Sequence, residues 1–267
     1  MSIITISRGS YSRGKEVAEK VAAKLGYDCL SRDIILETAI KYHVPEIKLI
    51  RALHDAPSIL DRLMGGKEKY IADFRAVLLE HLKKDNVVYH GLAGQFFLKG
   101  IPHVLKVRIL GNFEKRIQEE MKREGISEKA ARQILEDDDE ERRQWSIHLY
   151  GVDTWDPGLY DMVIKIDVIS VDCAAEFIAN AASRPIFKKT EASQKKLDDL
   201  SLAATVEAEI AESAVDHVRA DNGNVTVILK PGVKKKPALV EKISSSAAGI
   251  DGVKTIQVEA ATSKISF

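Results

Sequence analysis

The sequence has few of the residues that mark several common protein classes. Cysteine occurs only twice, as Cys29 and Cys173, far apart in apolar stretches. This excludes a disulfide framework and a cysteine-based metal cluster, and predicts buried thiols. No apolar run approaches the roughly 18 residues that a membrane-spanning helix needs. The first residues, Met1 to Ile6, lack the pattern of a secretory signal. We therefore expect a cytoplasmic protein without a transmembrane segment.

The chain also lacks an excess of charge of either sign. Its 40 basic and 40 acidic residues balance to a formal net charge of zero. No global field therefore favours a nucleic acid or an anionic membrane as partner. Of the 267 residues, 45% are hydrophobic and 30% charged, which is typical of a globular protein. This length predicts two domains of modest size.

Short β-branched runs alternate with helical periods along the first two thirds of the chain. Ile3 to Ile6 predicts a strand, and Val17, Val21 and Leu25 predict a helix that ends at Gly26. Further strands are expected over residues 27–30, 86–90, 104–109 and 162–166, and helices over 95–98, 113–123, 127–145 and 173–182. Residues 32–84 predict a helical insertion with breaks near Pro45, Pro57 and Gly65-Gly66. This alternation predicts an α/β domain with a parallel sheet flanked by helices.

A glycine-bearing loop joins the first strand to the first helix. Residues 9–15 match seven positions of the motif G-x-x-x-x-G-K-[ST] in the strand-to-helix context that the motif requires. Glycines allow backbone N–H groups to surround a phosphate, and the helix N-terminus adds partial positive charge. We expect nucleotide phosphates to be bound by Gly9, Ser10, Tyr11, Ser12, Arg13, Gly14, Lys15 and Glu16. The alternative is a turn that arises from packing alone, and Glu16 stands where a magnesium-ligating hydroxyl is usual.

Several sequence blocks resemble the cytidylate kinase-like family of P-loop proteins. They are ISRGSYSRGKEVAEKVAAKLGYDCLSRDIILETA, the run from Asn86 to Trp145, and a Gly-x-Asp-x-Trp-x-x-Pro-x-x-Tyr-Asp segment ending at Asp161. The resemblance covers most of residues 2–185. It implies a P-loop NTPase-type sheet of five parallel strands, ATP and Mg²⁺ as donor, and a nucleoside monophosphate, plausibly CMP, as acceptor. Lys15 stands where the family usually has arginine, and Glu16 is the family's own choice.

The resemblance also implies a charged lid whose arginines stabilise the transferred phosphoryl group. Together with Lys15, the catalytic candidates are Arg116, Arg123, Arg142 and Arg143. For each arginine the alternative is a solvated helix face with ion pairs, such as Arg116 with Glu120. The acidic run from Asp137 to Glu141 could hold magnesium, but neighbouring residues on a helix point in different directions. A solvated lid face is the better interpretation, so no metal ligand is assigned.

Candidates for the substrate site follow from the same blocks. They are Arg32, Asp33, His90 and Asp161. His90 ends a predicted strand and could contact a phosphate, or could be structural. Trp155 and Tyr160, close to Asp161, could stack on a base or seal the edge of the core.

The chain departs from the family pattern at several positions. Ser31 replaces an aspartate, Leu92 replaces an arginine expected to hold the acceptor phosphate, and Tyr11 and Arg13 replace loop glycines. Two hypotheses follow. The chain is either an enzyme that transfers the γ-phosphoryl group of ATP to a nucleoside monophosphate, or a catalytically degenerate nucleotide-binding regulatory or sensor protein.

The last third of the chain predicts a separate small α+β unit. We assign residues 1–187 to the kinase-like domain, 188–200 to a charged linker or solvated helix start, and 201–267 to the small unit. Its Asn222-Gly223-Asn224-Val225-Thr226 segment, a following helix and Gly252-Val253 resemble the BON domain. That resemblance implies regulation, binding of a small ligand or self-association, and a packing appendage is the alternative.

Overall fold

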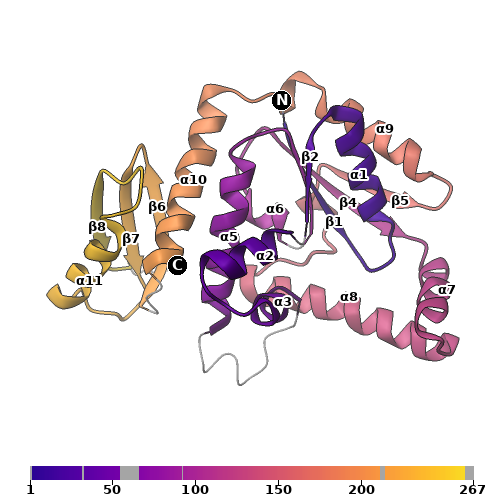
Figure 1. Ribbon diagram of the computed structural model, residues 1–267, viewed down its shortest axis with the longest axis horizontal. Coiled ribbons are helices and arrows are strands. Elements are labelled where there is room, and N and C mark those ends of the chain that lie inside the picture. The colour runs from indigo at the N-terminus through magenta and orange to yellow at the C-terminus, as the bar shows by residue number, and fades with distance from the viewer. Residues whose placement is uncertain (1, 32, 55–65, 92, 211–213, 262–267) are drawn as a thin grey trace, which may run out of the picture.

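The computed structural model describes residues 2–31, 33–54, 66–91, 93–210 and 214–261. Its larger part is built on a five-stranded sheet in the order β2-β3-β1-β4-β5, and every strand pairing in this sheet is parallel (Figure 1). The strands are β1 (Ile3–Arg8), β2 (Asp28–Leu30), β3 (Val87–His90), β4 (Val104–Gly111) and β5 (Met162–Ile166). The predicted fold class is confirmed. From β1 the chain continues to β2 and β3 on one side of the sheet, and then to β4 and β5 on the other side. The carboxyl end of β1 therefore lies at the point where the strand order reverses, which is where α/β proteins bind ligands.

Helices cover both faces of this sheet. On one face, α1 (Gly14–Leu25) and α9 (Val171–Ala182) pack against the apolar side chains of β1 and β4. Val17 and Val21 lie fully buried on that side of α1, and Gly26 ends the helix in the left-handed conformation at φ 67°. The opposite face carries α5 (Gly66–Leu82) and the short α6 (Gly94–Phe97), with Phe74 and Phe97 in its core.

The helical insertion predicted between the second and third strands is present. It contains α2 (Asp33–Lys41) and α3 (Glu46–His54), followed by α5. The break near Pro45 is confirmed, because α3 begins directly after it. The break near Pro57 falls outside the described residues, and of the break at Gly65-Gly66 only Gly66 is described, as the first residue of α5. Ile34 and Leu49 anchor α2 and α3 in the same core as Phe74.

Two consecutive helices form the segment predicted as the lid (Figure 1). They are α7 (Phe113–Glu124) and α8 (Glu128–Tyr150), and they are separated by Gly125 at φ 66°. The sequence predicted an end near Trp145, but α8 continues to Tyr150. The extra turn forms because Trp145 is buried and its ring lies 5.6 Å from that of Tyr150. The short η1 (Pro157–Leu159) then leads into β5.

The C-terminal unit is a three-stranded sheet with one helix of its own. The strands β6 (Val215–Asp221), β7 (Asn224–Leu229) and β8 (Thr255–Glu259) lie in that order, and α11 (Pro237–Ala247) connects the last two. The strands β6 and β7 form an antiparallel hairpin. Asn222 and Gly223, at φ 50° and 85°, turn the chain between β6 and β7.

A single helix, α10 (Glu191–Ile210), joins the two units (Figure 1). It includes most of residues 188–200, the segment assigned to a linker or a solvated helix start, but Leu197 in that segment is fully buried. The 3-10 helix η2 (Pro185–Phe187) precedes it. Leu197, Ala204 and Ala208 of α10 belong to the core around α5, whereas Ala203, Val206 and Ile210 belong to the core of the small unit. No helix of the described residues is long and apolar enough to cross a membrane.

Candidate functional site

The predicted phosphate loop connects β1 to α1 as a compact turn. Ser12 donates two hydrogen bonds to the carbonyl of Gly9, from its backbone N–H at 3.4 Å and from its hydroxyl at 2.9 Å. Tyr11 and Arg13 adopt left-handed conformations, at φ 51° and 62°. The helix begins at Gly14, and the N–H groups of a first helical turn have no intrahelical acceptor. The loop thus presents donors and the positive end of α1 to an anion.

Two glycines allow the loop to lie this close to its neighbours. A Cβ on Gly14 would lie 2.7 Å from the Cβ of Arg8, and one on Gly111 would lie 2.9 Å from the Cα of Ser12. Both distances are shorter than side chains normally permit. The end of β1 and the end of β4 are therefore in direct contact with the loop.

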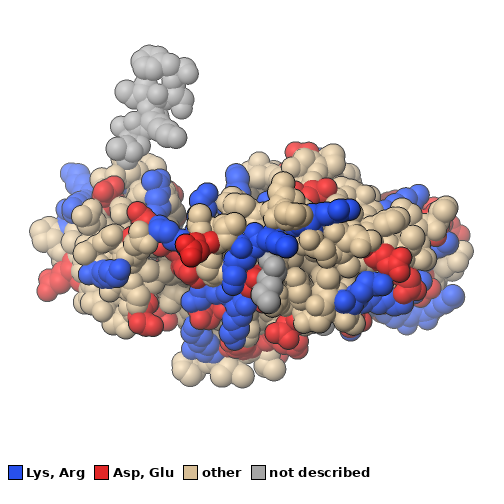
Figure 2. Space-filling model, turned by 90° about the horizontal axis from the view of Figure 1, so that it is seen from above, with Lys and Arg blue, Asp and Glu red and all other residues tan. Residues whose placement is uncertain are grey.

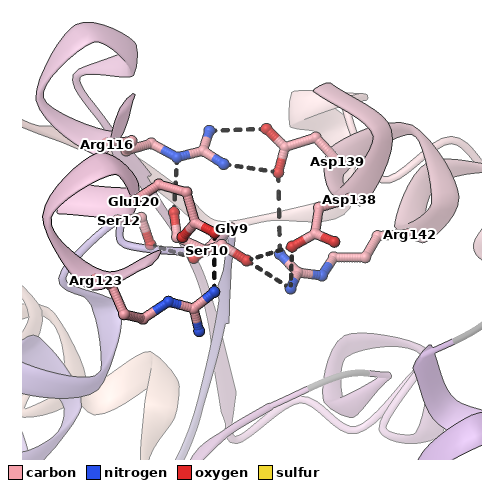
Figure 3. Close-up of polar contacts among 9 residues, drawn as sticks. All are labelled: Gly9, Ser10, Ser12, Arg116, Glu120, Arg123, Asp138, Asp139 and Arg142. Atoms are coloured by element: carbon pink, nitrogen blue, oxygen red, sulfur yellow. Dashed lines mark hydrogen bonds and ion pairs between the residues drawn. The ribbon is translucent and has the colours of Figure 1, made fainter. Parts of the chain in front are cut away.

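The lid closes on the loop through Arg116 and Arg142 (Figure 3). Arg116, only 8% exposed, donates from Nε to the carbonyl of Ser10 at 2.7 Å. Its two terminal nitrogens donate to Asp139 at 2.7 and 3.0 Å. Arg142 donates to the hydroxyl of Ser10 at 2.8 Å, and that hydroxyl donates to Asp138 at 3.0 Å. Two of the four predicted lid arginines therefore touch the loop through polar bonds.

The other two lid arginines are held differently. Arg123 donates to the buried carboxylate of Glu120 at 2.9 Å and lies over the Tyr11 ring at 5.4 Å. Burial, followed by the hydrogen bond with Glu120, raises the pKa of Tyr11 to about 12. Arg143 pairs with Asp153 at 2.9 Å, away from the loop. The ion pair between Arg116 and Glu120 that the sequence offered as an alternative is not formed. Arg116 pairs with Asp139, and Glu120 pairs with Arg123.

Lys15 and Glu16 are each paired with a neighbour in the sequence. The side chain of Lys15 is 65% exposed and its Nζ lies 3.6 Å from Glu19. Glu16 accepts a hydrogen bond from Nε of Arg13 at 3.0 Å, and this bond lowers the pKa of the Glu16 carboxyl. Neither side chain contacts the lid in this arrangement.

The described residues do not form a site that fits Mg²⁺. Glu16 is engaged by Arg13, and the two carboxylates nearest the loop, Asp138 and Asp139, are engaged by Ser10 and Arg116. Among the described residues there is no group of three or more His, Cys, Asp or Glu side chains that could hold a metal ion. Mg²⁺ usually takes one or two carboxylates together with substrate phosphates and water, and here those carboxylates already have cationic or hydroxyl partners.

The predicted substrate residues do not form one cluster. His90 is 4% exposed at the carboxyl end of β3, and burial, with a smaller effect of the Arg8 charge, lowers its pKa to about 4. It is therefore neutral near pH 7. Asp161 accepts a hydrogen bond from the backbone of Lys106 at 2.8 Å and fastens the start of β5 to β4. Asp33 is exposed at the start of α2, and Arg32 lies outside the described residues.

A small cleft of about 30 Å³ lies beside the loop, where β1 and β4 end. Arg8, Gln95, Arg108, Arg142 and Trp155 are among its lining residues. We did not predict Arg8, Gln95 or Arg108 from the sequence. Only Arg8 carried a usable signal, because it is a charged residue at the end of β1, whereas Arg108 follows Lys106 in the same alternation along β4. Ser7 and Arg108 are register partners across β1 and β4, and Arg8, the next residue of β1, is the partner of Ile109 and points to the opposite face of the sheet.

Comparisons with known proteins cover the larger domain. The model of the cytidylate kinase-like family matches residues 3–168. Among solved structures, an uncharacterized protein from Eubacterium ventriosum is 23% identical, with a TM-score of 0.52, over 69% of this chain and 100% of its own. A shikimate kinase from Acinetobacter baumannii in complex with shikimate is 15% identical, with a TM-score of 0.38, over 68% of this chain and 92% of its own. A dephospho-CoA kinase from Campylobacter jejuni is 19% identical, with a TM-score of 0.36, over 68% of this chain and 96% of its own.

These likenesses to solved structures bear on the fold alone. No curated protein matches the chain. The family match is more informative, because residues 3–168 make up more than half of the sequence and contain the phosphate loop, both lid helices and the cleft. The protein therefore belongs to the cytidylate kinase-like family.

Proposed function

We propose that this protein transfers the γ-phosphoryl group of ATP to a nucleoside monophosphate, with a CMP-like acceptor. An oxygen of the acceptor phosphate forms a bond to the γ-phosphorus, the bond from that phosphorus to the β-phosphate oxygen breaks, and ADP leaves with the electron pair. One observation carries the proposal. Arg116 and Arg142 of the lid both reach Ser10 of the phosphate loop, at 2.7 and 2.8 Å. Guanidinium groups in this position can stabilise charge on a transferred phosphoryl group.

Lys15 has to turn toward the phosphates to take part. Its present partner does not oppose this, because the pair with Glu19 is 3.6 Å long and both side chains are about half exposed or more. Exposed ion pairs of this kind contribute about 0–1 kcal/mol. A bound polyphosphate would offer the ammonium group a stronger partner. Mg²⁺ is expected to arrive with ATP, since the chain's own carboxylates at the loop are engaged.

A second candidate function is nucleotide binding without catalysis. It is favoured by the closed cleft, whose volume of about 30 Å³ suits a water molecule but not an acceptor. It is also favoured by Leu92 in the place where the family carries an arginine. In this case the nucleotide would shift the lid, and the rest of the chain would respond to that change.

A coupled ADP-release assay over a panel of nucleoside monophosphates separates the two candidates. Calorimetry of ATP and of each acceptor is run on the same protein, with and without Mg²⁺. Turnover with one acceptor well above the ATP hydrolysis background supports the enzyme. Tight ATP binding without turnover on any acceptor would reject the enzyme and support the binding protein.

For the C-terminal unit we propose a regulatory role of the BON-like kind, through a small ligand or a second copy of the chain. Its element order, with α10 followed by β6, β7, α11 and β8, supports the resemblance. A groove of about 940 Å³ lies along α10 between the two units and is lined by five lysines and five acidic residues. Seen from above, lysine and arginine side chains gather over this junction (Figure 2). Differential scanning fluorimetry with anionic metabolites, and light scattering over a concentration series, would test both forms of the role.

A further inference from the structure

Arg108 differs from the lid arginines in how its charge is compensated. Arg116 and Arg142 lie near Asp139, at 2.7 and 3.9 Å. Arg108 forms no ion pair with any described residue, and its hydrogen bonds go to neutral oxygens. The nearby carboxylate of Asp153 is already bound by Arg143 and by the backbone N–H of Trp155, each at 2.9 Å. A partly buried cation without a counter-ion costs free energy that a bound anion would recover.

The neutral contacts of Arg108 fix its orientation. Its Nη1 donates to the carbonyl of Thr154 and, at 3.2 Å, to the hydroxyl of Tyr160. The guanidinium carbon also lies 5.5 Å from the centre of the Tyr160 ring. Both bonds use the same nitrogen, and Nε and Nη2 donate to no described residue. The free edge of the guanidinium is the edge that forms paired bonds with an oxyanion.

A second buried group near Arg108 also lacks a partner. Gln95 is 7% exposed, lines the same cleft, and its side-chain amide forms no hydrogen bond with the described residues. Its amide atoms are not fully buried, so a ligand in the cleft could reach them. The cleft also contains Ser7 and Gly9, so it adjoins the first residue of the phosphate loop. An anion in this cleft would therefore lie next to a nucleotide phosphate on the loop.

We propose that Arg108 binds the oxyanion of the acceptor, assisted by Gln95, and that Tyr160 and the carbonyl of Thr154 position Arg108 for it. This deepens the proposed function and rests on it. The ligand is an acceptor with a phosphate or carboxylate group, rather than a neutral nucleoside. Arg108 would take the role that the family pattern gives to an arginine at the position of Leu92. Because the cleft now holds only about 30 Å³, the half-exposed side chain of Trp155 has to turn aside as the acceptor enters, while Thr154 stays in place.

The test compares acceptor binding in four full-length proteins by calorimetry. They are the unaltered chain, Arg108→Met, Tyr160→Phe, and Arg132→Met as a control from the exposed side of α8, where Arg132 pairs with Glu114 and Glu128. The probes are CMP and the other nucleoside monophosphates, cytidine, shikimate as a hydroxy acid, and ATP. Intrinsic fluorescence follows Trp155, which is 52% exposed at the cleft.

We expect Arg108→Met to weaken binding of the anionic acceptor by roughly ten- to a hundredfold while the affinity for ATP is unchanged. Tyr160→Phe keeps the ring contact with Arg108 but removes the hydroxyl. It should lower the affinity for the acceptor several-fold and raise KM more than it lowers kcat. It therefore tests the proposal even if Arg108→Met fails to fold. Cytidine should bind weakly and equally to all four proteins. A preference for nucleoside monophosphates or for shikimate identifies the source of the oxyanion.

The outcomes separate this proposal from the proposed function. Equal acceptor affinity in the unaltered chain, Arg108→Met and Tyr160→Phe overturns the role of Arg108, even if the enzyme is active. The role of Arg108 is also overturned if the unaltered chain binds none of the anionic acceptors. Arg108-dependent acceptor binding without any ADP release supports the anion site and rejects phosphoryl transfer.

Discussion

Arg116 forms a two-pronged contact with Asp139, at 2.7 and 3.0 Å, while its third nitrogen donates to the carbonyl of Ser10 at 2.7 Å (Figure 3). The lid thus supplies its own counter-ion at the phosphate loop. The carboxylate of Asp139 engages a guanidinium that a nucleotide phosphate could also engage. In the absence of nucleotide this pairing compensates the buried charge of Arg116, and a phosphate has to compete with it.

Asp139→Asn should therefore strengthen ATP binding. The amide keeps the size of the side chain but removes the negative charge that competes for Arg116. We expect a gain of roughly three- to tenfold in affinity by calorimetry. Asp137→Asn is the matched control and should leave the affinity unchanged, because Asp137 lies on the same acidic run and accepts a hydrogen bond from Gln133 rather than from an arginine. Weaker ATP binding in Asp139→Asn would show that Asp139 mainly holds Arg116 in place.

Arg116→Ala should reduce kcat by roughly a hundredfold or more, if the lid arginines stabilise the transferred phosphoryl group. The change also removes the bond to the loop carbonyl of Ser10, so some loss of thermal stability is expected. Initial rates at saturating ATP and acceptor measure the effect, with Arg132→Ala as a control for the loss of a lid charge. A kcat near that of the unaltered protein would exclude Arg116 from catalysis.

Lys15→Ala should abolish turnover without loss of stability. The side chain is 65% exposed and its ion pair with Glu19 is 3.6 Å long, so the fold does not depend on it. The ADP-release assay measures the first effect and thermal unfolding the second. Normal turnover in this variant would mean that another cation serves the terminal phosphates.

Gly111→Ala should destabilise the protein by about 1–3 kcal/mol and weaken ATP binding, because the added methyl group meets the backbone of the phosphate loop. The new Cβ would lie 2.9 Å from the Cα of Ser12, and backbone cannot rotate out of the way. Gly249→Ala, where nothing lies within 4 Å of the new atom, is the control. Urea unfolding followed by calorimetry gives both quantities.

His90 should make stability depend on pH between its ordinary pKa and its lowered one. Burial lowers the pKa from 6.5 to about 4, so across this range the unfolded chain binds a proton that the folded chain does not. Stability therefore rises with pH through this window and falls as the pH drops from 6.5 toward 4. His90→Gln should flatten that slope, with a change on the order of 1–3 kcal/mol. An unchanged pH profile of urea unfolding would contradict it.

The sequence predicted those features that depend on local pattern. The alternation of strands and helices located all five strands of the larger sheet, and Gly9, Gly14 and Lys15 located the loop. The resemblance also directed attention to Arg116 and Arg142, which the structure brings to Ser10.

Pairings over long separations were not predictable in the same way. Asp139 competes with Glu120 for Arg116, and only the packing of α7 on α8 decides between them. Arg108 looks like any polar residue on a strand until the segment around Thr154 folds over it. Residues 188–200 are mostly polar, and their helix depends on the burial of Leu197 against α5.

The helix α10 has a consequence for how the chain unfolds. Its Leu197 and Ala204 complete the core around α5, whereas Val206 and Ile210 complete the core of the small unit. Loss of either core would expose apolar surface of the other, so the two should melt in one cooperative transition. A nucleotide bound at the loop would then stabilise the C-terminal unit as well, through mass action on that shared transition.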